Sequence, residues 1–325
     1  MACRQKFWLR IHWNKCTAAT PCSSGTGGCR IWLFCPSRKA NIIMTELLQF
    51  EFMQRALLVA TITGAVCALV GVYVVLRGMS FIGAGIAHAS FGGVALGMLI
   101  GINPFFSAIL FCTGVAWGIG LVSESKRIHE DTAVGIFFAS TMAFGVLLLG
   151  FLKGYRVDLF SYIFGNILAV TQFDVWASLV LAVLVVSLIV LLFKEFLFLT
   201  FDAEAAQVAG LPVRRLNYLM LTIISLTIVL SIKAVGIVLV SALIVSPAAA
   251  AHQLTDDFKK MMLLSVVLGV SSTWIGLFLS SWLDSASGAT IVITATLIFF
   301  ICSAFSPHRR NLRRRLLTLR NDVGS

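Results

Sequence analysis

Long apolar runs recur along the chain from about residue 56 to residue 305. The runs are apolar on all sides, without the alternation of polar and apolar positions that marks a transmembrane β-strand. Their length and composition predict α-helices that cross a membrane, and indicate an all-α polytopic protein with about nine transmembrane helices, eight at the fewest. The predicted spans are 56–76, 82–101, 105–122, 132–152, 173–193, 217–232, 234–252, 261–280 and 288–305. The semi-polar stretch 155–172 is expected to be interfacial or re-entrant.

Composition supports this class of protein and excludes a single water-soluble core. Hydrophobic residues make up 59% of the 325 residues and charged residues 12%, about half the charged fraction of a soluble domain. The net charge of +11 could indicate a protein that binds nucleic acid. The basic residues, however, lie beside apolar spans, where they fix topology and contact anionic lipid. The sequence therefore predicts a membrane-lipid partner and no nucleic acid.

The distribution of Lys and Arg predicts the orientation, because cytoplasmic loops are enriched in both residues. Only Lys153, Arg156 and Lys233 fall between spans on one side. The other side has many more basic residues, and we therefore expect that side to be cytoplasmic. The C-terminus is expected to lie on the same side. That side holds Arg77, Lys126, Arg127, Lys194, Arg214, Arg215, Lys259, Lys260 and six tail arginines, Arg309, Arg310, Arg313, Arg314, Arg315 and Arg320.

The first 43 residues do not resemble the rest of the chain. They mix Trp, Cys, Arg, Ser and Gly without a helical period, and they carry seven basic residues. Nine spans would place these charges outside, against the orientation rule. We therefore expect residues 1–43 to be a non-native or disordered extension, with Met44 as the natural start. Residues 44–306 form the predicted membrane domain, and residues 307–325 a basic cytoplasmic tail.

His88 lies in the middle of the uncharged run 80–97. An ionisable side chain at membrane depth is costly, and it usually has a function and a partner. Four small residues spaced four apart, which let another helix approach closely, lie on the same predicted helix. They are Gly85, Ala89, Gly93 and Gly97. His88 is thus either a ligand in a polar path through the membrane or a core histidine hydrogen-bonded to a neighbouring helix.

The longest of the predicted cytoplasmic loops, 194–217, contains a short helix by its local sequence. Asp202 is a suitable N-cap, residues 203–209 are good helix formers, and Gly210 followed by Pro212 ends the helix. The helix is either a simple connector or a docking element for a cytoplasmic partner.

Two further residues are candidates for shaping a path. Pro247 lies within the seventh span and leaves the carbonyl of Leu243 without its helical donor. This either is a packed kink or bends a pathway. Asp284, the only acid at the outer end of the last two spans, is either a helix-end or turn residue or a further polar candidate for the path.

Motifs for ATP binding and for hydrolysis are absent from the sequence. It contains no Gly-x-x-x-x-Gly-Lys-[Ser/Thr] loop, no His-Glu-x-x-His and no Gly-x-Ser-x-Gly. The chain is therefore not expected to be an enzyme. Any uphill transport would draw its energy from a partner or from an ion gradient.

Six segments, in order, resemble the permease subunits of ABC importers for divalent transition metals, the zinc/manganese type. They are Val75-Leu-Arg-Gly-Met-Ser-Phe with His88-Ala and Gly93-Val-Ala-Leu-Gly; Asp131-Thr-Ala-Val-Gly-Ile; Asp158-Leu-Phe-Ser-Tyr-Ile-Phe-Gly-Asn-Ile-Leu-Ala-Val; Phe201-Asp-Ala-Glu-Ala-Ala with Gly210-Leu-Pro; Val235-Gly-Ile-Val-Leu-Val-Ser-Ala-Leu-Ile-Val-Ser-Pro; and Ser287-Gly-Ala-Thr-Ile-Val. Together they run from about Met44 to Arg310.

The resemblance implies an ABC importer permease fold in the cytoplasmic membrane of a prokaryote. It implies a homodimer of permeases, separate cytoplasmic ATPase subunits and an extracytoplasmic metal-binding protein. His88 looks like the histidine of the metal pathway, with no permanent cofactor and Zn²⁺ or Mn²⁺ passing transiently. Many members carry an Asp one helical turn before this histidine, where this chain has Ala84, and a Ser before it, where this chain has Ala87. The loop resembles the family's coupling helix, with Phe201, Asp202, Glu204, Ala206, Gly210 and Pro212 as its candidate residues.

Three alternatives remain open from the sequence. A permease for an iron chelate or corrinoid would need a wide cavity and more spans. An ion-coupled secondary transporter would show inverted repeats and broken helices, and no clear repeat is visible. An intramembrane enzyme is disfavoured by the missing motifs.

Overall fold

The computed structural model describes residues 51–124, 128–151, 165, 170–283 and 285–305. Within them every regular element is an α-helix. Nine of the described helices are long and apolar enough to cross a membrane, and α9 and α10 are the two short ones. The helices are α3 (Glu51–Leu76), α4 (Ser80–Ile100), α5 (Pro104–Ser123), α6 (Glu130–Phe151), α8 (Gln172–Leu191), α9 (Phe193–Phe201), α10 (Ala203–Val208), α11 (Val213–Val235), α12 (Ile237–Leu254), α13 (Phe258–Leu283) and α14 (Ser287–Ala304).

This architecture confirms the predicted all-α membrane fold. The predicted extension 1–43, the tail 307–325 and most of the semi-polar stretch 155–172 lie outside the described residues.

Local sequence sets the start of several helices. Asn103 caps α5 by accepting a hydrogen bond from the backbone N–H of Phe105 at 3.0 Å, and Pro104 follows as the first helical residue. Thr171 and Asp174 form a reciprocal capping box at the start of α8. Such caps satisfy backbone N–H groups that have no partner within the helix. They fix where each helix emerges from its loop.

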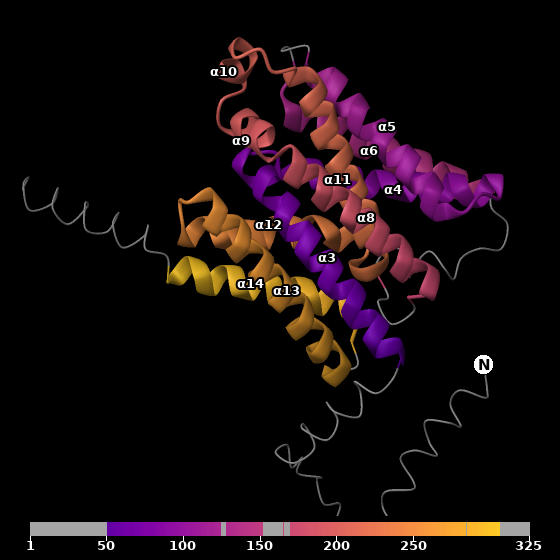
Figure 1. Cartoon of the computed structure of the whole chain (residues 1–325). Coiled ribbons are helices and arrows are strands. Elements are labelled where there is room, and N and C mark those ends of the chain that lie inside the picture. The colour runs from indigo at the N-terminus through magenta and orange to yellow at the C-terminus, as the bar shows by residue number, and fades with distance from the viewer. Residues whose placement is uncertain (1–50, 125–127, 152–164, 166–169, 284, 306–325) are drawn as a thin grey trace, which may run out of the picture. The chain divides into compact units, whose positions relative to one another are not determined.

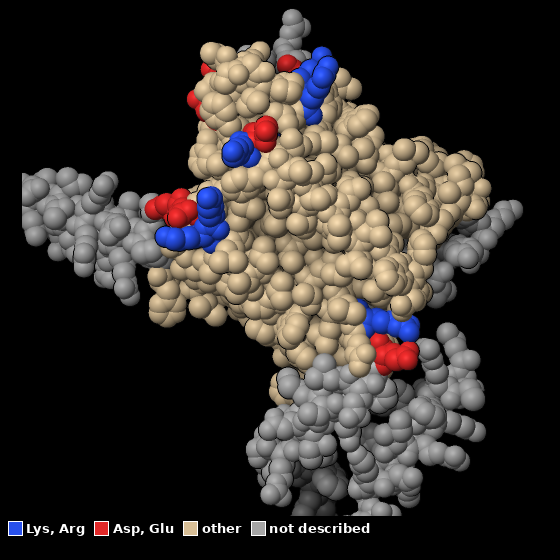
Figure 2. Space-filling view, in the orientation of Figure 1, with Lys and Arg blue, Asp and Glu red and all other residues tan. Residues whose placement is uncertain are grey.

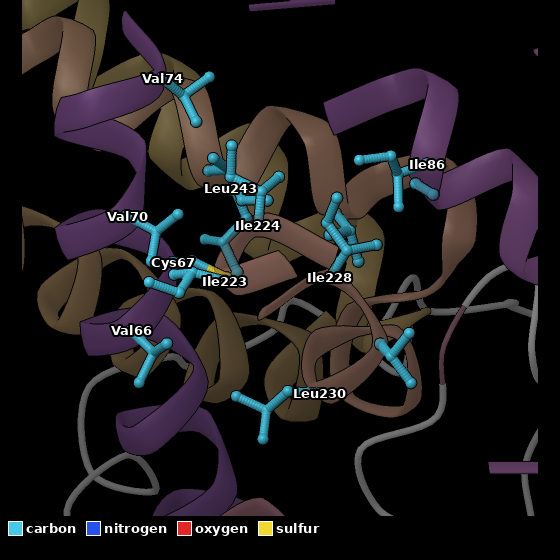
Figure 3. Close-up of a cluster of buried hydrophobic side chains, with 14 of the residues drawn as sticks. Val66, Cys67, Val70, Val74, Ile86, Ile223, Ile224, Ile228, Leu230 and Leu243 are labelled. Atoms are coloured by element: carbon cyan, nitrogen blue, oxygen red, sulfur yellow. The ribbon is translucent and has the colours of Figure 1, made fainter. Parts of the chain in front are cut away.

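The buried core is built around α3 and α11, the helices that Figure 3 shows in close-up. α11 packs against α3, α4, α5, α8 and α12, which makes it the central helix of the described bundle. A polar contact ties the two core helices together, with the Cys67 sulfur 2.9 Å from the Ser231 hydroxyl. The labelled apolar side chains from α3, α4, α11 and α12 are Val66, Val70, Val74, Ile86, Ile223, Ile224, Ile228, Leu230 and Leu243.

Two groups of helices flank this core (Figure 1). α4 packs against both α5 and α6, whereas α3 packs against α13, and α14 against α12 and α13. The approach of α3 and α13 is close, because a Cβ at Gly269 would lie 2.6 Å from the carbonyl oxygen of Gly64. Ser265 of α13 also donates a hydrogen bond to the carbonyl of Ala68 at 2.8 Å. Small residues thus let these backbones meet, as in other membrane bundles.

The outer surface is that of a lipid-facing protein. Figure 2 shows Lys, Arg, Asp and Glu gathered toward the ends of the visible face, with a broad uncharged region between them. Large apolar side chains are exposed along the helices, among them Leu110 at 78%. Water would penalise such a surface, and a hydrocarbon environment does not. The exposed apolar faces therefore fit the membrane core.

Candidate functional site

His88 projects from α4 toward α6. Its Nδ1 lies 2.9 Å from the carbonyl oxygen of Ala84. Since a carbonyl only accepts, Nδ1 carries the proton and donates it. In its neutral form, a ring bonded in this way keeps a lone pair on Nε2, and that form of histidine binds a metal. The ring lies against Phe138 of α6, with centroids 4.6 Å apart and planes tilted by 59°.

His88 does not belong to a cluster of metal-binding side chains in the described part of the chain. Among those residues no group of three or more His, Cys, Asp or Glu side chains is placed to hold a metal ion. The position one turn before His88 is Ala84, whose carbonyl already accepts the imidazole proton. The described side chains therefore give no ready-made ligand set around His88, and the dimer mate, carbonyls near Pro247 and Asp284 stay open as sources of further ligands.

The glycines of α4 place His88 by bringing two neighbouring helices close. A Cβ at Gly85 would lie 2.7 Å from a methyl carbon of Val134 in α6. A Cβ at Gly93 or Gly97 would instead meet α5, at 2.9 Å from the Cα of Ala108 and 2.8 Å from the Cβ of Ser107. Ala89, in the same stripe, is fully buried. The four small residues of α4 thus pack against two helices, whereas their spacing alone indicated one neighbouring helix.

Two further glycines, which lie outside the four-residue stripe, also bring α4 and α6 close together. A Cβ at Gly92 would lie 3.1 Å from the carbonyl oxygen of Thr141, and a Cβ at Gly145 would lie 3.0 Å from the Cα of Gly92. Gly92 falls one residue outside the four-residue stripe, so only a pairwise comparison of α4 with α6 would have found it. These contacts hold the His88 face of α4 against α6.

Pro247 lies inside α12 and is buried. It removes the donor for the carbonyl of Leu243, as the sequence predicts. The neighbouring turn of α12 is held tightly by α3, because a Cβ on Gly71 would collide with the carbonyl of Ile244. α12 also packs against α4, near Gly83 and Ser241. Asp284, the other candidate named from the sequence, lies outside the described residues.

The loop between α8 and α11 contains the predicted short helix. Asp202 has an extended backbone and separates α9 from α10. Its carboxylate accepts a hydrogen bond from the backbone N–H of Ala205 at 2.8 Å, which confirms the predicted cap. The helix ends where Gly210 adopts a φ of 85°. The N–H of Leu211 then bonds back to the carbonyl of Ala206 at 3.1 Å, as glycine-terminated helices do.

α10 presents most of its surface outward. Ala206 is its only buried residue, whereas Glu204 is exposed and Val208 is 90% exposed. Phe201, just before the helix, is 66% exposed although its ring meets Phe258 at 6.2 Å. Pro212 is exposed and caps α11. An exposed Phe and Val beside a capped helix form a surface suited to a protein partner.

A cleft of about 1230 Å³ separates α10 from the neighbouring ends of the bundle. Two polar links lie in its walls, each made by an arginine that the charge pattern placed on the cytoplasmic side, with a partner that the sequence did not reveal. Arg77 donates a hydrogen bond to the Oδ1 of Asn217 at 3.0 Å, and Arg214 holds the Glu124 carboxylate through two nitrogens at 3.1 Å. The lining residues are Leu76, Arg77, Met79, Ser123, Glu124, Glu130, Leu199, Thr200, Ala203, Gln207, Leu211, Pro212, Val213, Arg214, Arg215 and Asn217.

Arg77 differs from the other arginines of the cleft because it is partly buried. Burial lowers the pKa of its guanidinium, and the nearby Glu130 carboxylate acts in the opposite direction. A partly desolvated guanidinium needs partners for its N–H groups. The bond to Asn217 supplies one of them.

Comparison with known proteins identifies the family. The family model of the ABC 3 transport family matches residues 49–306. The chain belongs to the ABC 3 transport family.

Relatives in this family support the assignment along the same region. The chain is 41% identical over 266 residues to the manganese transport system membrane protein MntC of Listeria innocua, covering 82% of this chain and 95% of the relative. It is 38% identical over 267 residues to the manganese import system permease protein ScaB of Streptococcus gordonii, covering 82% and 96%.

A solved structure shows that the ABC 3 resemblance extends to the fold. PsaBC from Streptococcus pneumoniae, determined in complex with a Fab, has a chain with a TM-score of 0.77 and 35% identity. The match covers 85% of this chain and 99% of that chain. The predicted family and the predicted ABC permease fold are therefore both confirmed.

Proposed function

We propose that this ABC 3 protein is the membrane permease subunit of an ATP-driven importer of divalent metal ions, and that manganese is the ion it carries. The observation that carries the proposal is the match along 49–306, together with relatives named for manganese transport. Because the sequence has no nucleotide-binding loop, ATP hydrolysis belongs to separate cytoplasmic ATPase subunits. The permease itself catalyses no reaction.

His88 is the proposed pathway ligand. Its Nε2 lone pair is available because Nδ1 is engaged by the Ala84 carbonyl. One imidazole binds an ion weakly, which suits passage because the ion must also leave. A twofold dimer of permeases would bring a second imidazole, and Mn²⁺ or Zn²⁺ would retain water as further ligands. Pro247 would shape the path by bending α12.

The end of the bundle that carries α10 is the proposed cytoplasmic side. The charged residues Arg77, Arg214 and Arg215 line the cleft at that end, as the positive-inside rule requires. With nine spans beginning at α3, the chain after α14 would lie on the same side. α10 would dock on the ATPase through its exposed residues, and an extracytoplasmic metal-binding protein would deliver the ion at the opposite end.

The test is metal uptake into proteoliposomes that contain the permease and its ATPase subunits. With ATP supplied on the α10 side, labelled Mn²⁺ should accumulate, and unlabelled Zn²⁺ added in excess measures whether zinc shares the path. His88→Ala should reduce uptake at least about tenfold, a typical loss when a metal ligand environment is removed. The matched control is His252→Ala, which removes an exposed histidine at the end of α12 and should leave uptake unchanged.

Three results would contradict the proposal in different ways. Uptake that needs no ATP but collapses with the proton gradient would remove the importer assignment. Uptake supported only by ATP on the opposite side would reverse the orientation. Normal uptake by an assembled His88→Ala complex would make His88 a packing residue and leave the importer assignment in place.

A further inference from the structure

The turn between α3 and α4 is held as a compact unit. The N–H groups of Arg77, Gly78 and Met79 bond back to carbonyls in the last turn of α3, at 3.0–3.1 Å. Gly78 adopts a φ of 71°, and α4 begins at Ser80. Arg77 therefore cannot shift without moving the start of α4, the helix that carries His88.

The other end of the Arg77 contact lies on a helix that continues directly from α10. Asn217 is in the first turns of α11, which starts at Val213. The connection from α10 is short and hydrogen-bonded, with the N–H of Val213 bonded to the carbonyl of Leu211 at 2.8 Å. The N–H of Leu216 likewise bonds to the carbonyl of Pro212 at 3.1 Å. A displacement of α10 is thus passed to the start of α11.

α10 and α4 are not among the principal helix pairs that pack together in the described part of the chain. α10 packs against α9 and α11, and the cleft separates it from the α3–α4 turn. Ala203 and Gln207 line the α10 side of that cleft, and Leu76 and Met79 line the opposite side. The empty volume also gives α10 room to move. Among the described residues, α11 connects the two sides, because it packs against both α3 and α4 and because Asn217 near its start accepts a hydrogen bond from Arg77.

Of the two polar links in the walls of the cleft, the one made by Arg77 is the better suited to transmit movement. The Arg214–Glu124 pair is exposed, with side-chain exposures of 70% and 32%, and exposed ion pairs contribute little. Arg77 is partly buried, so losing its bond would leave desolvated N–H groups without a partner. It also reaches the turn before α4, whereas Glu124 lies at the end of α5.

From this geometry we infer that Arg77 is a positioning residue that links α10 to the metal-pathway helix α4, through its hydrogen bond to Asn217. The inference rests on the proposed function, in which α10 docks on the ATPase. Movement of α10 would pull the start of α11, then Asn217 and Arg77, and so the base of α4. The residue touches neither ion nor nucleotide and acts only through the helices it joins.

The test measures ions taken up per ATP hydrolysed, in the same proteoliposomes. Arg77→Met and Asn217→Leu each remove the bond while keeping side-chain bulk, and each should lower the ratio by at least about fivefold, the lower end of typical coupling between sites. The double variant should be no worse than the more impaired single variant, because both remove one contact. Arg215→Met is the control: it removes an exposed arginine of the same cleft and should keep the wild-type ratio.

A conservative variant separates positioning from simple folding. Asn217→Asp keeps an acceptor for Arg77 and should retain coupling, whereas Asn217→Leu should lose it. This pair decides the question even if Arg77→Met does not assemble. Equal ratios for Asn217→Asp and Asn217→Leu, whether both normal or both reduced, would overturn the inference.

The same assay distinguishes failure of the inference from failure of the proposed function. The α10 variant Glu204→Arg with Gly210→Leu should uncouple hydrolysis from uptake if α10 docks on the ATPase. Normal coupling in that variant would refute the docking assignment itself. Uncoupling there, with normal ratios in the Arg77 and Asn217 variants, would refute only the link to α4.

Discussion

The close approach of α4 and α5 at Gly93 makes a sharp quantitative test of the packing around His88. Substitution by Ala adds one methyl group, which would lie 2.9 Å from the Cα of Ala108 and 3.0 Å from the Cβ of Phe111. Ordinary contacts begin at 3.4 Å, so the first distance is 3.4 − 2.9 = 0.5 Å too short. One neighbour is backbone, which cannot rotate away, and the two helices must separate.

The expected cost follows from that overlap. Forcing an extra methyl group into a packed interface costs about 1–3 kcal/mol. Replacing Gly by Ala within a helix also gains about 0.5–1 kcal/mol from backbone entropy. The gain can be measured separately at Gly114, on α5, where an added Cβ meets nothing within 4 Å. Gly93→Ala should therefore be less stable than Gly114→Ala by about 1–3 kcal/mol.

The assay is unfolding of the purified permease in mixed detergent micelles, followed by tryptophan fluorescence and analysed for both variants under the same conditions. Metal uptake should fall in parallel for Gly93→Ala, because separating α4 from α5 displaces the helix that carries His88. Equal stability of the Gly93 and Gly114 variants would show that the two helices adjust freely at this contact. Small residues would then not fix the position of α4.

Three further predictions concern single backbone features. Asp202→Ala removes the 2.8 Å capping hydrogen bond from the N–H of Ala205 and should cost α10 about 1 kcal/mol of local stability. Amide hydrogens across α10 should then exchange about fivefold faster, whereas in Asp202→Asn they should exchange at the wild-type rate. Gly210→Ala places a Cβ at a φ of 85° with open space around it, so it should cost about 1–2 kcal/mol from the backbone alone, measured by thermal unfolding, with Asn tolerated better than Ala. Gly71→Ala would force its methyl group into the carbonyl of Ile244, and its yield of folded protein in size-exclusion chromatography should fall below that of Gly93→Ala.

The sequence predicts the transmembrane helices well because hydrophobicity and length determine insertion. It predicts their ends less well, for a physical reason. The sixth span was expected at 217–232, whereas α11 covers Val213–Val235. Arg214 and Arg215 look like a loop in a hydropathy pattern, yet a helix continues into the headgroup region where charged side chains reach water. The break before α12 comes at Gly236, whose φ is 95°.

The candidate site was predictable only in part. An imidazole in an uncharged span stands out in the sequence, as does the cap–stop pattern from Asp202 to Gly210, because both depend on local residue types. The residues that contact these candidates could not be predicted from the sequence. Phe138 beside His88, and Asn217 beside Arg77, come from segments 50 and 140 residues away. No local rule pairs them, since the packing of helices selects which faces meet.

The glycine contacts of α4 determine how an opening movement can be divided among the helices. α4 meets α6 at Gly85 and α5 at Gly93 and Gly97 with no space for a methyl group. Surfaces that interlock this tightly cannot slide past one another, so α4, α5 and α6 should travel as one rigid body. α3 and α13 are interlocked in the same way around Gly64 and Gly269. α12 belongs with α3, because a Cβ at Gly71 would collide with the carbonyl of Ile244, whereas a Cβ at Gly83 of α4 would still lie 3.9 Å from Ser241 of α12. Relative movement of the two bodies is therefore expected where α4 meets α12, and access to the ion would alternate along that contact.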